Sequence, residues 1–262
     1  MHASVFLRPS SVLALGSLLL TLSAPAAAQT PSETIERVKP SVVAVGTFQR
    51  TRSPQFQFSG TGFAVADGTY IVTNAHVLPP MLDPTKMEVS AILLPGKDRD
   101  QVQVREARQV AVDSTYDIAL LKIDGAALPA LKLRNSDNVR EGQDVLFTGF
   151  PIGAVLGPFP ATHRGIVSAI TPIAIPQARA ADLDAKMLRR LTQGSFPVFQ
   201  LDATAYPGNS GSPVYDPLTG DVLGVVNMVL VKGTRESILS QPSGITYAVP
   251  SKYLQALIDK GR

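Results

Sequence analysis

A glycine-rich turn, Pro207-Gly-Asn-Ser-Gly-Ser-Pro213, contains the residue types that acyl transfer requires. Acyl transfer needs an oxygen nucleophile and backbone N–H groups that face the substrate carbonyl oxygen as it becomes negative. Gly208 can adopt a positive φ, so the N–H groups of Gly208 and Ser210 can converge as an oxyanion hole. The same letters also suit an ordinary turn between strands. Ser212 stands where a Gly-x-Ser-x-Gly nucleophile elbow has its second glycine.

A serine nucleophile requires a general base, and the chain has three histidines. His2 belongs to the N-terminal leader. His163 has no acidic residue near it in the sequence, and we expect it at the surface or the rim of the fold. His76 ends the apolar run Tyr70–Val77, a rigid place from which an imidazole can reach into a cleft. A lone histidine in such a place is often structural, but His76 is the base that remains for Ser210.

The base in turn requires a carboxylate on its second ring nitrogen. Asp117 stands at the head of the apolar run Ile118–Ile123. An unpaired carboxylate that enters a core is costly, so Asp117 needs a hydrogen-bonded partner, although a turn or a cap could provide one. Taken together, His76, Asp117 and Ser210 predict a catalytic triad.

Short runs rich in Val, Ile, Leu and Phe must position these residues, and Gly, Pro and Asp separate the runs. The polar stretch Leu128–Gly142 divides them into two sets of six, which favours an all-β fold of two six-stranded antiparallel β-barrels. We predict one barrel over residues 29–135, with His76 and Asp117, and a second over residues 136–262, with Ser210. The expected strands are Ser41–Phe48, Gly60–Val65, Tyr70–Thr73, Met87–Leu94, Val102–Val112, Ile118–Ile123, Asp144–Phe150, Thr162–Thr171, Val198–Leu201, Gly211–Tyr215, Asp221–Val231 and Ile245–Val249.

Two stretches have helical periodicity instead. Ala178–Gln193 is rich in helix formers and has apolar residues at spacing i, i+4 and i+8, which predicts a short surface helix. In Ser251–Lys260 the apolar residues fall on one face and Ser251 can cap the N-terminus. We expect this C-terminal helix to pack on the second barrel.

Residues 1–28 have the pattern of a cleavable signal peptide. A modestly basic start precedes the apolar run Ser11–Leu22, and small residues then allow cleavage between Ala28 and Gln29. A membrane span needs about 20 apolar residues, more than this run contains, although an uncleaved anchor is the alternative. We therefore expect a periplasmic or secreted protein without an integral membrane segment after cleavage.

Composition excludes several other classes. The chain contains no Cys, so it has neither disulfides nor thiolate metal ligands. The formal net charge is +3 without a basic stripe, so a nucleic-acid partner is not expected. No cofactor and no metal are expected, and the partners should be protein or peptide substrates.

The quoted motifs resemble the trypsin-like (chymotrypsin-fold) serine proteases, and among them the protease domain of the bacterial HtrA (Deg) type. The resemblance runs from about residue 36 to 255. It implies that the site lies in a crevice between the two barrels, with His76 and Asp117 from the first and Ser210 from the second. The matching segments are Ser59–Phe63, Val72–Val77, Tyr116–Lys122, Arg164–Ala169, Pro207–Gly211 and Gly244–Pro250.

The chain also departs from that family. Ser212 occupies a position where the family usually has Gly. Asn209 stands where digestive members have an Asp that pairs with a newly cut N-terminus, so no activating cut beyond signal removal is expected. No PDZ domain is expected after the second barrel, and the stretch from Pro172 to Phe196 looks longer than in HtrA relatives.

The resemblance also implies a specificity pocket. The family places the floor of this pocket six residues before the nucleophile, and here that residue is Thr204. Without a carboxylate there, small or medium apolar side chains are expected and Lys or Arg are not. The segment Gly224–Val229, which includes Asn227, should form the pocket wall and pair with an extended peptide.

The sequence thus predicts an exported serine endopeptidase that works through an acyl-enzyme. Two alternatives use the same residues. One is a catalytically silent exported peptide-binding protein, for which Ser212 is the main support. The other is an esterase-like acyl hydrolase with the same triad.

Overall fold

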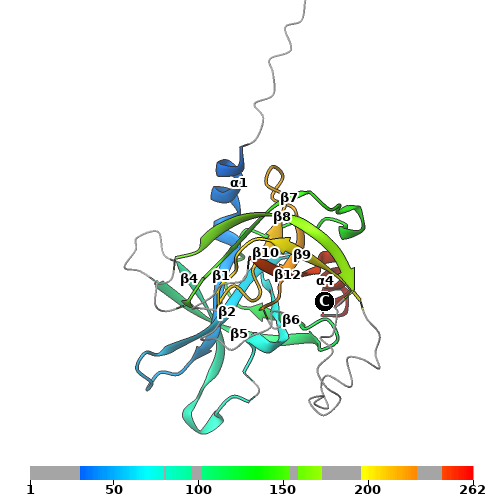
Figure 1. Cartoon of the computed structure of the whole chain (residues 1–262). Helices are drawn as coiled ribbons and strands as arrows, with labels where there is room; N and C mark the ends of the chain where they lie inside the picture. The colour runs from blue at the N-terminus through cyan, green and yellow to red at the C-terminus, as the bar shows by residue number, and fades with distance from the viewer. Residues whose placement is uncertain are drawn as a thin grey trace, which may run out of the picture.

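The computed structural model describes residues 30–79, 81–95, 102–153, 159–172, 196–228 and 244–261. The signal peptide expected over residues 1–28 and the helix expected over 178–193 lie outside these ranges. The described strands close into two six-stranded antiparallel barrels, in the orders β1-β2-β3-β6-β5-β4 and β10-β11-β12-β9-β8-β7 (Figure 1). The predicted all-β, two-barrel fold is confirmed.

Each of the twelve predicted runs overlaps one strand, and the deviations are at the ends; residues 229–231 of the run Asp221–Val231 lie outside the described ranges. Strand β4 begins two residues later than predicted, because Pro84–Lys86 forms a 3-10 turn and Met87 then adopts a φ of 52°. The strands of the first barrel are β1 Val42–Phe48, β2 Phe56–Val65, β3 Tyr70–Asn74, β4 Val89–Pro95, β5 Val102–Asp113 and β6 Ile118–Ile123. Those of the second are β7 Asp144–Gly149, β8 Ala161–Pro172, β9 Pro197–Asp202, β10 Pro213–Tyr215, β11 Val222–Val226 and β12 Ile245–Pro250.

Helix α1, Pro31–Val38, was not predicted, although its start has a sequence signature. Thr30 and Glu33 form a capping box, in which each side chain accepts a hydrogen bond from the other's backbone N–H. The helix docks on the turn between β10 and β11, where the Thr34 hydroxyl donates to the Leu218 carbonyl at 2.9 Å. The first described element therefore contacts the second barrel.

Helix α4, Ser251–Gly261, is the expected C-terminal helix. Its apolar face buries Leu254, Leu257 and Ile258. The helix contacts β5 and β6 of the first barrel as well as β11 and β12 of the second, so it packs on both barrels and not on the second alone (Figure 1).

The hydrophobic core is continuous between the barrels. One buried cluster combines β-strand residues of the first barrel, such as Phe63 and Leu120, with Tyr215 and Val225 of the second and with α4. Each barrel also has a separate cluster of its own. Leu133, in the connection, pairs with Val222 of β11, so the boundary at residues 135 and 136 stays a prediction. The buried side chains that the two barrels share fix the barrels against each other. A site that lies between the barrels requires such a fixed arrangement.

Candidate active site

The register between β3 and β6 brings His76 and Asp117 together. Asn74, the last residue of β3, pairs with Ile118, the first residue of β6. The chain continues past Asn74 into the 3-10 turn Ala75–Val77, which lifts His76 off the sheet. Asp117 precedes Ile118 directly and therefore lies beside the imidazole.

The backbone of Asp117 is held in an uncommon conformation. Its φ is 54°, in the left-handed region that non-glycine residues seldom adopt. The Asp117 carbonyl oxygen accepts hydrogen bonds from the Ala75 N–H at 3.1 Å and from the Asn74 side-chain amide at 3.0 Å. These bonds fix the direction in which the carboxylate leaves the backbone.

Both oxygens of the Asp117 carboxylate are hydrogen-bonded. Oδ1 accepts from the backbone N–H of His76 at 3.0 Å, and Oδ2 lies 2.6 Å from His76 Nδ1. Oδ2 also accepts from Asn227 Nδ2 at 2.9 Å. Because a carboxylate only accepts, Nδ1 carries the proton and the second ring nitrogen is free to act as a base. That nitrogen, Nε2, lies 2.9 Å from Ser210 Oγ.

The environment keeps Asp117 ionised although the residue is 8% exposed. Burial by itself raises the pKa of the carboxyl, but the hydrogen bonds from the His76 ring, the His76 backbone N–H and the Asn227 amide outweigh it. The net pKa of Asp117 is therefore lowered from its ordinary value. A carboxylate in this state stabilises a positive charge on the imidazole.

Ser210 lies in the nucleophile turn, which we define as Pro207–Ser212, between β9 and β10. Gly208 within it has a φ of 103°, and a Cβ there would lie 2.3 Å from the Phe150 carbonyl oxygen. A residue with a side chain would therefore have to displace either this turn or residue 150. The turn requires glycine at this position, as its sequence indicated.

Two carbonyl groups of the nucleophile turn are anchored to N–H groups inside the protein. The Pro207 oxygen accepts from the Ile152 N–H at 2.6 Å, and the Asn209 oxygen accepts from the Ser212 N–H at 3.0 Å. Ile152 reaches Pro207 with a φ of 57°, which is rare for a β-branched residue.

The Pro207 carbonyl shares a peptide with the Gly208 N–H, and the Asn209 carbonyl shares one with the Ser210 N–H. Because N–H and C=O point in opposite directions in a trans peptide, both N–H groups are directed away from these anchors. Neither N–H donates to any residue within the described ranges. Their assignment as an oxyanion hole stays a prediction, and this orientation supports it.

The structure places the expected specificity residues in two different settings. Thr204 lies half-buried between β9 and the nucleophile turn. The Asn227 side chain is 1% exposed and donates to the Asp117 carboxylate, and its expected part in peptide binding stays a prediction. Val229, the last residue of the expected pocket wall, lies outside the described ranges.

His163, expected at the surface or rim, is partly buried on β8. Its ring stacks on Phe147, with ring centres 4.8 Å apart, and burial lowers the pKa of its imidazole. It makes no hydrogen bond to Asp117 or Ser210, whereas His76 makes both.

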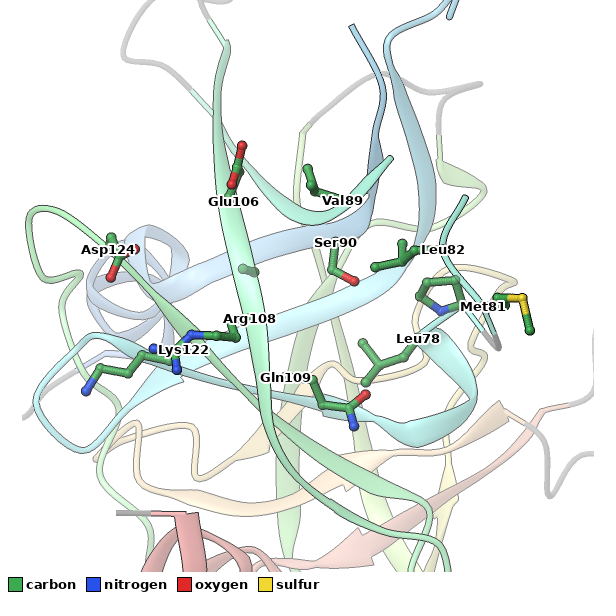
Figure 2. Close-up of a pocket in the computed structure, with 12 residues that line it drawn as sticks. Leu78, Met81, Leu82, Val89, Ser90, Glu106, Arg108, Gln109, Lys122 and Asp124 are labelled. Atoms are coloured by element: carbon green, nitrogen blue, oxygen red, sulfur yellow. The ribbon is translucent and has the colours of Figure 1, made fainter. Parts of the chain in front are cut away.

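A separate hollow of about 500 Å³ lies on the outer side of the first barrel. Figure 2 shows Leu78, Met81 and Leu82 at one end and Lys122 and Asp124 at the other. None of the three predicted triad residues lines it. Along the parts of the chain that are described, no three His, Asp or Glu side chains gather as metal ligands, and no helix is long and apolar enough to cross a membrane.

Known proteins resemble this chain in sequence and in structure. The family model for the trypsin-like peptidase domain matches residues 60–225. Among curated relatives, a probable periplasmic serine endoprotease DegP-like from Pseudomonas fluorescens is 31% identical over 201 residues, which is 76% of this chain and 34% of the relative. A protein of the same description from Pseudomonas fulva is 29% identical over 210 residues, or 80% of this chain and 36% of the relative.

The chain thus spans about a third of the length of these curated relatives. A solved structure of an HtrA-type protease with a tripeptide matches with a TM-score of 0.58 and 22% identity, over 88% of this chain and 62% of the other. That likeness agrees with the two-barrel fold. Because the family model covers more than half of the sequence, this chain belongs to the trypsin-like peptidase family.

Proposed function

We propose that this chain is a serine endopeptidase with Ser210 as nucleophile, His76 as general base and Asp117 as the carboxylate that orients the base. The observation that carries the proposal is the continuous hydrogen-bonded series Asp117–His76–Ser210, with distances of 2.6 Å and 2.9 Å. Its geometry satisfies the requirement that nucleophile and base lie about 2.6–3.2 Å apart. Membership of the peptidase family supports the same reaction.

The reaction then proceeds in two halves. Ser210 Oγ attacks the scissile carbonyl while His76 Nε2 takes its proton, and the N–H groups of Gly208 and Ser210 receive the negative oxygen. His76 next gives the proton to the leaving amine, which departs and leaves an ester on Ser210. A water molecule, deprotonated by His76, attacks that ester, and His76 returns the proton to Ser210 Oγ as the acid is released. Asp117 stays ionised throughout and stabilises the imidazolium.

We further propose that cleavage follows small or medium apolar residues. A Lys or Arg side chain that enters a pocket loses its water, and only a buried carboxylate compensates that loss. Thr204 at the expected pocket floor has no charge. Of the two acidic residues nearest to Thr204 in the sequence, Asp202 is exposed and Asp216 forms an ion pair with Arg134 at 3.0 Å.

The site of action that we propose is the periplasm or the extracellular space. The curated relatives are named periplasmic endoproteases, and residues 1–28 have the pattern of a signal peptide. The proposed substrates are protein or peptide chains.

The position of Ser212 weakens the alternative of a silent binding protein. The Ser212 side chain is fully buried, and a Cβ placed on Gly149 of β7 would lie 1.9 Å from its hydroxyl oxygen. The hydroxyl therefore faces the interior behind the nucleophile turn and leaves the approach to Ser210 clear.

Labelling with a fluorophosphonate, followed by a casein digest, separates the three candidate functions. Labelling with digestion of casein supports the peptidase. Labelling with turnover of esters alone supports the esterase, and absence of labelling in a folded protein supports the binding protein. A Ser210→Ala variant, which keeps the fold and lacks the nucleophile, is the matched control.

A further inference from the structure

Thr61, in β2 of the first barrel, holds two carbonyl groups of the nucleophile turn in the second barrel. Its hydroxyl donates to the Gly208 oxygen at 2.7 Å, and its backbone N–H donates to the Ser210 oxygen at 2.8 Å. The residue is fully buried, so water cannot readily replace either contact.

The Thr61 hydroxyl is committed to this contact. Its oxygen already accepts a hydrogen bond from the Phe150 N–H at 3.1 Å. A hydroxyl has a single hydrogen to donate, and here that hydrogen goes to the Gly208 oxygen. The result is a buried relay from the Phe150 N–H through Thr61 to the Gly208 carbonyl.

The anchored carbonyl lies between the two groups proposed as the oxyanion hole. It belongs to the peptide that joins Gly208 to Asn209, whereas the two hole N–H groups belong to the peptides on either side. Gly208, with a φ of 103°, has no side chain that resists rotation of this peptide. Hydrogen bonds at its two ends keep its plane fixed: the Asn209 N–H donates to the Tyr206 oxygen at 2.9 Å, and the Gly208 oxygen accepts from the Thr61 hydroxyl.

We propose that Thr61 is a positioning residue for the oxyanion hole: its hydroxyl locks the Gly208 carbonyl and thereby the direction of the Gly208 and Ser210 N–H groups. The inference rests on the proposed peptidase function. Thr61 belongs to the first barrel, whereas Gly208 and Ser210 belong to the second. The oxyanion hole therefore takes its final geometry only when the two barrels pack together.

Thr61→Val tests the proposal, since valine keeps the shape of threonine and lacks the donor. We expect kcat on a peptide amide to fall about 10²- to 10³-fold, as when one oxyanion donor is lost, while KM changes less than about threefold. The affinity for a peptide aldehyde, which forms a tetrahedral adduct with the nucleophile, should fall in parallel with kcat. Thr61→Ser keeps the donor and should restore kcat to within about threefold of the original chain, on the same logic.

Thr34→Val is the matched control for loss of a buried hydroxyl. Thr34, in α1, is also fully buried, and its Oγ1 donates at 2.9 Å to the Leu218 carbonyl between β10 and β11. We expect this variant to melt lower and to keep kcat and aldehyde affinity once folded. If Thr61→Val does not fold, Thr61→Ala replaces it with the same expectations.

Two outcomes overturn the proposal. One is that the donor-free variant keeps kcat and aldehyde affinity within about threefold while it stays folded. The other is that Thr34→Val loses both to the same extent, which would make the effect one of packing alone. If the unmodified chain neither labels with fluorophosphonate nor cleaves peptides, the proposed function itself fails, a result that is distinct from both.

Discussion

Gly149→Ala should destabilise the protein because three polar side chains converge on this glycine. A Cβ at residue 149 would lie 1.9 Å from Ser212 Oγ, 2.9 Å from Asn209 Oδ1 and 2.9 Å from Thr61 Oγ1. All three neighbours are fully buried, so none of them can swing into solvent. Overpacking of a buried site typically costs about 1–3 kcal/mol.

The expected loss can be read as a melting temperature. For a chain of this size about 1 kcal/mol corresponds to roughly 2–4 °C, so Gly149→Ala should melt about 2–12 °C lower. The shortest contact involves the Ser212 hydroxyl, which Ser212→Ala removes without changing the backbone. Ser212→Ala should therefore cost little alone and recover about 1 kcal/mol or more when combined with Gly149→Ala.

The assay is a double-mutant cycle by calorimetry or circular dichroism, together with kcat for each folded variant. Asn209 and Ser212 belong to the nucleophile turn, so we expect Gly149→Ala to lower kcat and the double variant to regain part of it. Strict additivity of the two melting shifts would refute the reasoning, because it would show that residues 149 and 212 do not share the space that the structure assigns to them.

Ser210→Ala and His76→Ala should each lower turnover by several orders of magnitude, and appreciable activity in either variant would remove the triad assignment. Asn227→Leu removes a hydrogen bond that lowers the pKa of the Asp117 carboxyl, so that pKa should rise toward its ordinary value. Stability from a lowered carboxyl pKa is present above the unfolded value, about 3.9, and is lost as pH falls through the folded value. The variant should therefore lose part of this stability at neutral pH, and its melting temperature should approach that of the original chain as the pH falls. Melting temperatures that differ by a constant amount from pH 2 to 7 would contradict this. In a digest of denatured proteins, cuts should follow small or medium apolar residues, and Thr204→Asp should weaken them; a majority of cuts after Lys or Arg would contradict the argument.

Much of this architecture was predictable because its signals are local. His76 and Asp117 each stand at the end of an apolar run, and a strand end is where a side chain can leave a sheet for a cleft. The pairing of the two runs follows from the fold, since β3 and β6 are neighbours in the barrel. The alternation of short apolar runs and turn residues sufficed for the two barrels themselves.

The contacts that sequence reasoning missed join distant segments. The hydrogen bond from Asn227 to Asp117 spans 110 residues, and that from Thr61 to Gly208 spans 147. No local pattern marks either partner, because a buried amide or hydroxyl looks in the sequence like any other polar residue in or beside a strand. Helix α1 is a different case, since Thr30-Pro-Ser-Glu33 is a capping signature that the adjoining leader obscured.

The long spans between site residues have a consequence for the order in which the protein becomes active. His76 and Ser210 are 134 residues apart, and Thr34 of helix α1 contacts Leu218, 184 residues further along the chain. Closure of such large loops occurs late in folding, after local hairpins have formed. A chain still emerging from the ribosome contains His76 well before it contains Ser210. The hydrogen-bonded series Asp117–His76–Ser210 therefore forms only when nearly the whole polypeptide is present.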